Sequence, residues 1–139
     1  MDLELANFLI ANALEYRRRN NLKPLTIAVI DAGGHLVALQ REDGTSNLRA
    51  EIAQGKAKGA VAMGLGSRAL FNRAQEQPYF ISAMNALNGG SLVPVPGGVL
   101  IKRDGVLIGA IGITGDSSDN DEACALAAIE NAGLSAEAG

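Results

Sequence analysis

Apolar residues along this chain follow two patterns, one with the spacing of a helical face and one of short uninterrupted runs. The helical spacing predicts a first helix that follows Asp2 and ends near the basic run 17–19. Caps and breakers then predict four more helices, at about 48–63, 67–75, 79–87 and 119–131. Three of these have a side chain suited to capping their first turn, at Ser46 or Asn47, at Ser67 and at Ser118.

The uninterrupted apolar runs predict two β-hairpins. Residues 25–31 and 35–41 flank a turn that contains two glycines, and residues 99–102 and 106–114 flank an Asp-Gly turn. Both alternating faces of 25–31 are apolar, so the sheet should be covered on both sides. The run 106–114 is apolar almost throughout, which favours a central position.

The remaining segments are predicted to lie at the margins of the fold. Residues 91–95 should be extended, and the prolines beside them restrict this stretch to an edge strand or a loop. The chain beyond Gly133 should be a tail. The order of helix, hairpin, helices, hairpin and helix predicts an α+β fold, with helices layered on an antiparallel sheet of about five strands in a single domain, 1–139.

Composition and charge narrow the class of protein. The 139 residues include 23 alanines and 17 glycines but only five aromatic residues, so the core should be built from small side chains. The formal charge is −3 and no basic stripe occurs, which argues against nucleic acid as a partner. No apolar run is long enough to span a membrane, and the first residues lack the basic start of a signal peptide, so we expect a cytoplasmic protein.

Four stretches together resemble the GlcG/HbpS-like family, which also contains the C-terminal domain of PduO. The first is Val29-Ile-Asp-Ala-Gly-Gly-His-Leu-Val-Ala-Leu-Gln-Arg-Glu-Asp-Gly44. The others are Glu51-Ile-Ala-Gln-Gly-Lys-Ala57, Pro96-Gly-Gly-Val-Leu-Ile101 and Gly105-Val-Leu-Ile-Gly-Ala-Ile-Gly-Ile-Thr-Gly115 with Asp119-Asn-Asp-Glu-Ala123. The resemblance implies profilin-like α/β/α layering and a homo-oligomer. It also implies haem binding, as in some members, or a part in corrinoid or organic-acid metabolism, as in others.

Several residues carry candidate chemistry, and each also has a plain structural explanation. Four residues are candidate catalytic groups. His35 could be a general base or a haem ligand. Glu51 and Lys56 on the second helix could transfer protons, as could the carboxylate of Asp116 at the end of a strand. Four residues are candidate ligand-binding groups. Arg41 and Lys56 are cations that could bind an anionic ligand. Gly97 and Gly98 could offer it their backbone N–H groups. No set of His or Cys residues suits a metal site.

Two functions of different classes agree with these residues. The first is a homo-oligomeric protein that binds a small organic acid, or a tetrapyrrole such as haem, in a pocket between the second helix and the sheet. The second is a cofactor-independent isomerase, lyase or hydrolase acting on an organic acid. A third alternative is an accessory subunit without a ligand. The scarcity of aromatic side chains weighs against haem, because haem pockets usually stack such residues on the macrocycle.

Overall fold

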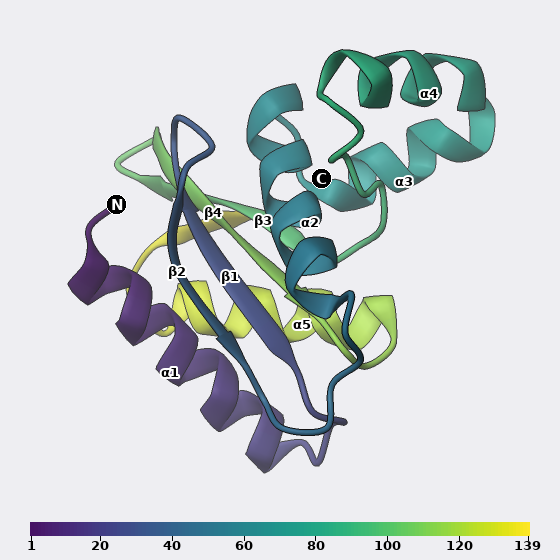
Figure 1. The fold of residues 1–139 in the computed structure, drawn as a ribbon. Helices are drawn as coiled ribbons and strands as arrows, with labels where there is room; N and C mark the ends of the chain where they lie inside the picture. The colour runs from purple at the N-terminus through teal and green to yellow at the C-terminus, as the bar shows by residue number, and fades with distance from the viewer.

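The computed structural model describes residues 1–139 and has three layers, with helices on both faces of one sheet (Figure 1). All neighbouring strands are antiparallel, in the order β2-β1-β4-β3-β5. The α+β class and the five-stranded sheet are therefore confirmed. In chain order the elements are α1 (Leu3–Arg19), β1 (Thr26–Asp31), β2 (Leu36–Arg41), α2 (Arg49–Met63), α3 (Ser67–Glu76), α4 (Pro78–Leu87), β3 (Gly98–Arg103), β4 (Val106–Thr114), α5 (Ser118–Glu130) and β5 (Ser135–Glu137).

The strand periodicity divides the core between the two faces of the sheet. Alternate residues of β1, β3 and β4 pack against α1 and α5 in the larger cluster, which includes Ile27, Val29, Ile111 and Ile113. The intervening residues, such as Ile30, face α2 in a smaller cluster. Because both faces are covered, β1 is buried along almost its whole length, as its apolar pattern predicts.

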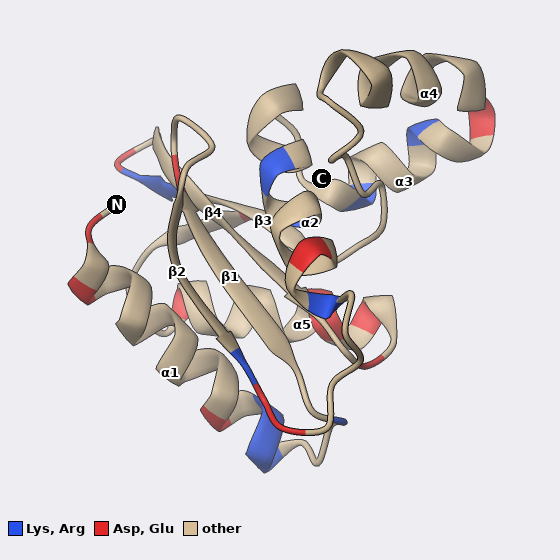
Figure 2. Cartoon of the chain, viewed as in Figure 1, with Lys and Arg blue, Asp and Glu red and all other residues tan.

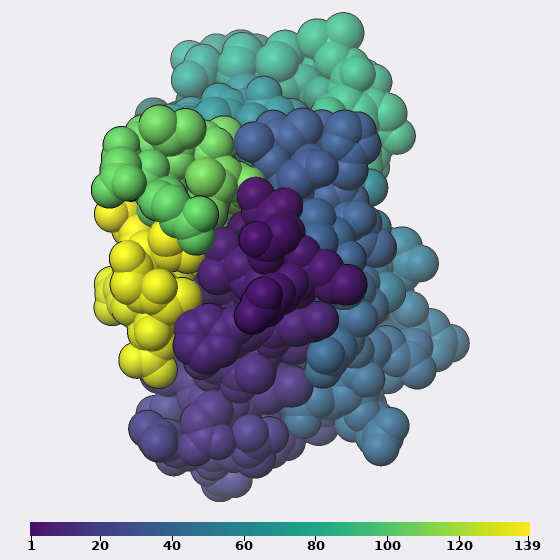
Figure 3. Space-filling view, turned by 90° about the vertical axis from the view of Figure 1, so that its left-hand side faces the viewer, coloured from purple at the N-terminus to yellow at the C-terminus, as the bar shows by residue number.

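Helix α1 lies across one outer face of the molecule. Figure 3 shows it between β2 on one side and the C-terminal residues on the other. Asp2 caps its first turn by accepting a hydrogen bond from the backbone N–H of Leu5. Helices α3 and α4 instead project beyond the sheet and share a small cluster of their own around Leu70, Ile81 and Leu92 (Figure 1).

The fifth strand is formed by a segment that was expected to be a tail. Residues 91–95 form a loop, one of the two predicted alternatives, because Pro94 and Pro96 have no N–H to donate to a ladder. The predicted C-terminal tail instead forms β5 and pairs with β3. A three-residue strand has too little periodicity to be recognised in a sequence.

All three predicted helix caps are also wrong. Ser117, rather than Ser118, caps α5 by accepting a hydrogen bond from Asn120. No side chain caps α2, and Ser46 accepts a hydrogen bond from the Arg49 side chain instead. Ser67 is the first residue of α3, and its buried hydroxyl bonds to Gly98 on β3. Ser67 thus serves a tertiary contact that helix signals alone do not reveal.

Glycines let α2 approach its neighbours closely. A Cβ atom at Gly55 would lie 2.5 Å from Val93 Cγ2, and one at Gly59 would lie 3.2 Å from Leu92 Cγ. Gly112 on β4 is more restrictive, because its Cβ atom would lie 1.9 Å from the carbonyl oxygen of Ala53. The backbone of α2 therefore rests directly on β4.

Charged residues are spread over several elements rather than gathered on one face (Figure 2). Acidic residues are frequent at the start of α5, which lies near the start of α2 (Figure 2). None of the helices is long and apolar enough to cross a membrane.

Candidate functional site

A pocket of about 250 Å³ opens where the start of α2 meets the end of β4 and the start of α5. Its lining combines three apolar residues with hydroxyl and charged groups: Arg49, Ile52, Lys56, Val93, Val95, Thr114, Asp116, Ser118 and Asp121. The position agrees with the predicted pocket between the second helix and the sheet. Of the residues selected from the sequence, it contains Lys56 and Asp116.

Lys56 forms a buried ion pair at the bottom of this pocket. Its side chain is 3% exposed, and that of its partner Asp121 is 1% exposed. The ammonium group donates to Asp121 Oδ2 at 3.1 Å and to the carbonyl oxygen of Ile113 at 2.8 Å. The other Asp121 oxygen accepts the backbone N–H of Asp116 at 3.0 Å. Each charge thus has partners, as burial of a charge requires.

Burial moves the two pKa values of this pair toward each other. Desolvation lowers the pKa of Lys56, and the Asp121 charge opposes that shift only in part. Desolvation likewise raises the pKa of Asp121 against the effect of Lys56. The free-energy difference between the ion pair and a neutral amine beside a carboxylic acid is therefore smaller than in water.

Arg49 supplies a second cation to the same pocket. Its guanidinium donates to Ser46 Oγ at 3.1 Å and to Thr114 Oγ1 at 2.7 Å. No carboxylate lies within ion-pair distance of it, so its charge is not neutralised by the protein. Because Arg49 and Lys56 bond to oxygens of the consecutive residues Thr114 and Ile113, both cations lie at one end of β4.

Asp116 lines the pocket but has a well-defined structural role. Its carboxylate accepts the side-chain amide of Asn120 and the backbone N–H groups of Lys23 and Ser117. These hydrogen bonds, that of Asn120 foremost, lower the pKa of Asp116 to about 2. A carboxylate with so low a pKa is a weak base, so the geometry assigns Asp116 to joining two loops rather than to proton transfer.

Gly97 and Gly98 lie beside the ion pair and make room for it. A Cβ atom at Gly97 would lie 2.9 Å from the Lys56 ammonium nitrogen, and one at Gly98 would lie 2.3 Å from the Lys56 carbonyl oxygen. The N–H of Gly98 donates to the Ser67 hydroxyl at 2.7 Å. The donor of Gly98 is therefore occupied, and both glycines allow close packing beside Lys56.

Two other residues selected from the sequence lie outside the pocket. Glu51 is exposed on α2, and Arg41 is exposed at the end of β2. Glu51 precedes Lys56 by five residues, a spacing that does not bring two side chains together on a helix. The structure thus separates both residues from Lys56, and the cation that accompanies Lys56 is Arg49.

His35 lies at the turn between β1 and β2, with 80% of its side chain exposed. Its Nδ1 lies 3.1 Å from Asp31 Oδ1, which also accepts the backbone N–H groups of Gly33 and His35. These hydrogen bonds lower the pKa of Asp31, and the one donated by the His35 N–H has the largest effect. They orient the ring and leave Nε2 without a partner in the protein. No group of three or more His, Cys, Asp or Glu side chains could hold a metal ion.

A family model described as haem degrading protein HbpS-like matches residues 1–130. The chain belongs to this HbpS-like family. Protein GlcG of Escherichia coli K12 is 34% identical to it over 111 residues, which are 80% of this chain and 78% of GlcG. Corrinoid adenosyltransferase PduO of Salmonella typhimurium LT2 is 32% identical over 106 residues, which are 76% of this chain and only 31% of PduO. The resemblance inferred from the sequence is confirmed.

Solved structures of HbpS-like proteins share the fold. The crystal structure of a PduOC–haem complex superposes with a TM-score of 0.86 at 27% identity and covers 97% of this chain and 96% of that one. The crystal structure of HbpS gives a TM-score of 0.81 at 25% identity, over 94% of this chain and 89% of HbpS.

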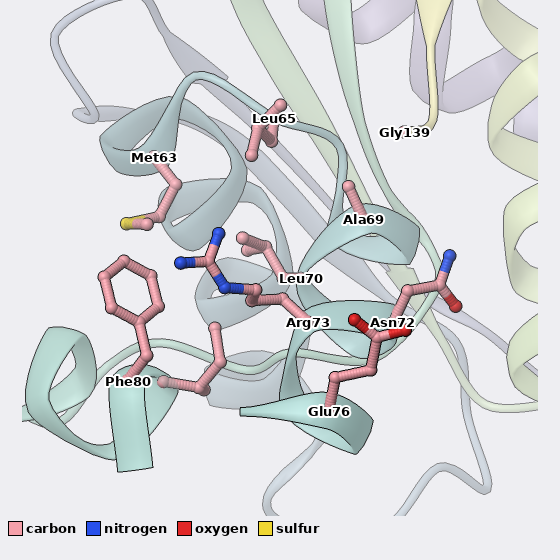
Figure 4. Close-up of a pocket in the computed structure, with 10 residues that line it drawn as sticks. Met63, Leu65, Ala69, Leu70, Asn72, Arg73, Glu76, Phe80 and Gly139 are labelled. Atoms are coloured by element: carbon pink, nitrogen blue, oxygen red, sulfur yellow. The ribbon is translucent and has the colours of Figure 1, made fainter. Parts of the chain in front are cut away.

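A second concavity of this HbpS-like chain lies between the end of α2 and the helices α3 and α4 (Figure 4). Its lining is mainly apolar and includes Met63, Leu70 and Phe80. The Arg73 guanidinium lies 4.1 Å from the centre of the Phe80 ring, a cation–π contact. None of the residues selected from the sequence lines this concavity, and it has no imidazole.

Sequence reasoning missed the two residues that complete the polar pocket. Asp121 is part of an acidic first turn, which the helix dipole explains equally well. Its burial follows only from the way α5 packs on the sheet. Arg49 could be recognised from the sequence. It precedes Ile52 by three residues and Lys56 by seven, so the three side chains share one helical face.

Proposed function

We propose that this HbpS-like protein binds a small organic acid in the pocket between α2 and the end of β4. The observation that carries the proposal is the Arg49 guanidinium, a cation without a carboxylate partner that lines a pocket already containing the Lys56–Asp121 pair. A ligand carboxylate at Arg49 would neutralise this charge through two parallel N–H···O bonds. A volume of about 250 Å³ suits a molecule of metabolite size.

Replacement of Arg49 by Gln should weaken binding of a small carboxylate about tenfold or more, because hydrogen bonds between charged groups contribute roughly 1.5–3 kcal/mol. Calorimetric titration with pyruvate and with lactate measures this loss. Arg41→Gln removes a cation outside the pocket and should leave the affinity unchanged. Equal losses in the two variants would mean that general attraction by positive charge, rather than this pocket, binds the acid.

Haem is a second candidate ligand, supported by His35 and by the likeness to the PduOC–haem complex. The donor set fits one axial ligand, because Asp31 holds Nδ1 of the only histidine and Nε2 stays free. A carboxylate behind a metal-binding imidazole fixes the ring and raises its basicity. When bound, haem supplies an iron centre for redox or ligand-binding chemistry, and His35 would hold that iron while Asp31 orients the ring.

In a haem titration, His35→Ala should abolish the Soret shift that the unchanged protein gives. Asp31→Asn should weaken haem binding by a smaller factor, because it removes the group that orients the ring but not the ligand. Absorption spectra of the ferric and ferrous forms report the axial ligand directly. An unchanged Soret band in His35→Ala would exclude this histidine as the ligand.

A further inference from the structure

We infer that Lys56 is a nucleophilic amine that forms an imine with the carbonyl group of a 2-oxo acid. The inference rests on the proposed binding of an organic acid and adds the substrate class and the reactive atom. Three features of the pocket carry it: a buried amine at its bottom, a carboxylate beside that amine, and a free guanidinium near the opening.

The two cations match the two functional groups of a 2-oxo acid. Arg49 is placed to hold the carboxylate through its unused N–H groups. The Lys56 nitrogen lies beside the carbonyl oxygen of Ile113, one residue before Thr114 in β4. In a 2-oxo acid the carbonyl carbon is bonded directly to the carboxylate carbon. A carboxylate at Arg49 therefore points the neighbouring carbonyl toward Lys56.

Asp121 provides the proton transfers that the reaction needs. Lys56 first gives a proton to the Asp121 carboxylate, and the freed nitrogen lone pair attacks the carbonyl carbon. A C–N bond forms, the C=O π electrons move to oxygen, and Asp121 returns its proton to that oxygen. The nitrogen then gives a proton back to the Asp121 carboxylate, and Asp121 passes it to the hydroxyl oxygen. The C–O bond breaks, and one water molecule leaves as the C=N bond forms. The balance is ammonium plus carbonyl to protonated imine plus water, with Asp121 again a carboxylate and without an oxidant or reductant.

The buried setting favours the neutral amine that this attack requires. The pKa of Lys56 is lowered and that of Asp121 is raised, both chiefly by desolvation. Arg49 lowers the pKa of Lys56 further by its charge. Asp116, the other carboxylate that lines the pocket, uses its oxygens on Lys23, Ser117 and Asn120 and is not available to Lys56. Asp121 is therefore the only carboxylate in position to exchange a proton with the amine.

Reductive trapping of the unaltered protein tests the inference without relying on a variant that must fold. The protein is incubated with pyruvate and cyanoborohydride, and its peptides are mapped by mass spectrometry. We expect a stable secondary amine on Lys56 at least tenfold faster than on Lys23, Lys58 or Lys102. Lactate has a hydroxyl in place of the carbonyl and should compete for the pocket without labelling it. Lys56→Arg should remove the label, with Lys58→Arg as the matched control on the same helix.

The outcomes separate this inference from the binding that it rests on. Calorimetric binding of pyruvate together with selective labelling of Lys56 supports both. Binding of pyruvate and lactate without a Lys56 label overturns the imine and leaves the binding proposal intact. Labelling of all four lysines at similar rates also overturns it, since that is the behaviour of exposed amines. If neither acid binds and Lys56 stays unlabelled, both proposals fail.

Discussion

Lys56→Met should lower the free energy of unfolding by about 3–5 kcal/mol at neutral pH, the typical cost of removing one partner from a buried ion pair. The variant leaves the Asp121 carboxylate buried without its cation, and the 1% exposure of that side chain prevents compensation by water. Urea denaturation followed by circular dichroism measures the change. Lys58→Met, on the same helix and partly exposed, should stay within about 0.5 kcal/mol of the unaltered protein.

The loss in Lys56→Met should depend on pH with a defined sign. Burial already raises the pKa of Asp121 with Lys56 present, and removal of Lys56 takes away the largest opposing effect. The hydrogen bond from the Asp116 N–H remains, but the pKa of the carboxyl in the folded state should lie still further above the unfolded value. A group with a raised folded pKa contributes stability at low pH and loses it as the pH rises through the folded pKa. The destabilisation should therefore be largest at neutrality and shrink as the pH falls toward about 4, the unfolded pKa of an aspartate.

A double variant provides a second check on the ion pair. Lys56→Met combined with Asp121→Leu removes both charges and should recover part of the lost stability, since apolar replacements of buried pairs are often neutral. Recovery should be incomplete, because the Asp116 N–H loses its acceptor on Asp121. If Lys56→Met lowers the free energy of unfolding no more than Lys58→Met does, the buried ion pair is contradicted.

Gly112→Ala should destabilise the protein by about 1–3 kcal/mol or more, the range for inserting a methyl group into a packed interior. Its Cβ atom would lie 1.9 Å from the Ala53 carbonyl oxygen, and a backbone atom of a helix cannot swing aside as a side chain can. Helix α2 must shift as a unit, and Lys56 and Arg49 shift with it. We expect both a lower Tm and weaker binding of small carboxylates.

Gly59→Ala is the matched control for this prediction. Its Cβ atom would meet the Leu92 side chain at 3.2 Å, a contact that a small side-chain movement relieves. Alanine is also the better helix former by about 1 kcal/mol, so the stability of this variant should change little or rise. A Tm for Gly112→Ala that equals that of Gly59→Ala would show that α2 does not rest on the β4 backbone as described.

Local patterns predicted most of the fold correctly. Both hairpins and all five helices lie close to their expected bounds, because apolar spacing, caps and Asp-Gly or Gly-Gly turns are properties of neighbouring residues. Two of the errors have a common cause. Strand β5 and the side chain of Ser67 are determined by partners far along the chain, β3 and Gly98, and no local signal encodes those partners.

The candidate site was predicted less well for the same reason. Lys56 was selected because it lies in a family-like motif, but its partner Asp121 is 65 residues away. Arg41 is as good a cation as Arg49 in the sequence, and only its place on the edge strand β2, with β1 between it and β4, puts it outside the pocket. Asp116 has the residue type and position of a catalytic carboxylate, yet its hydrogen bonds keep its pKa near 2.

The α+β class, the hairpins, the family and a core of small side chains follow from the amino-acid order, because periodicity, turn chemistry and composition are local or additive properties. Which charges meet depends on how the chain folds in space. Whether a lysine is a solvated surface group or a buried amine depends on the helices and strands that close over it, and those come from distant parts of the chain. Two glycines illustrate the point. Gly112 lets α2 lie directly on β4, and Gly97 leaves space for the Lys56 ammonium group, so the site needs both close approaches.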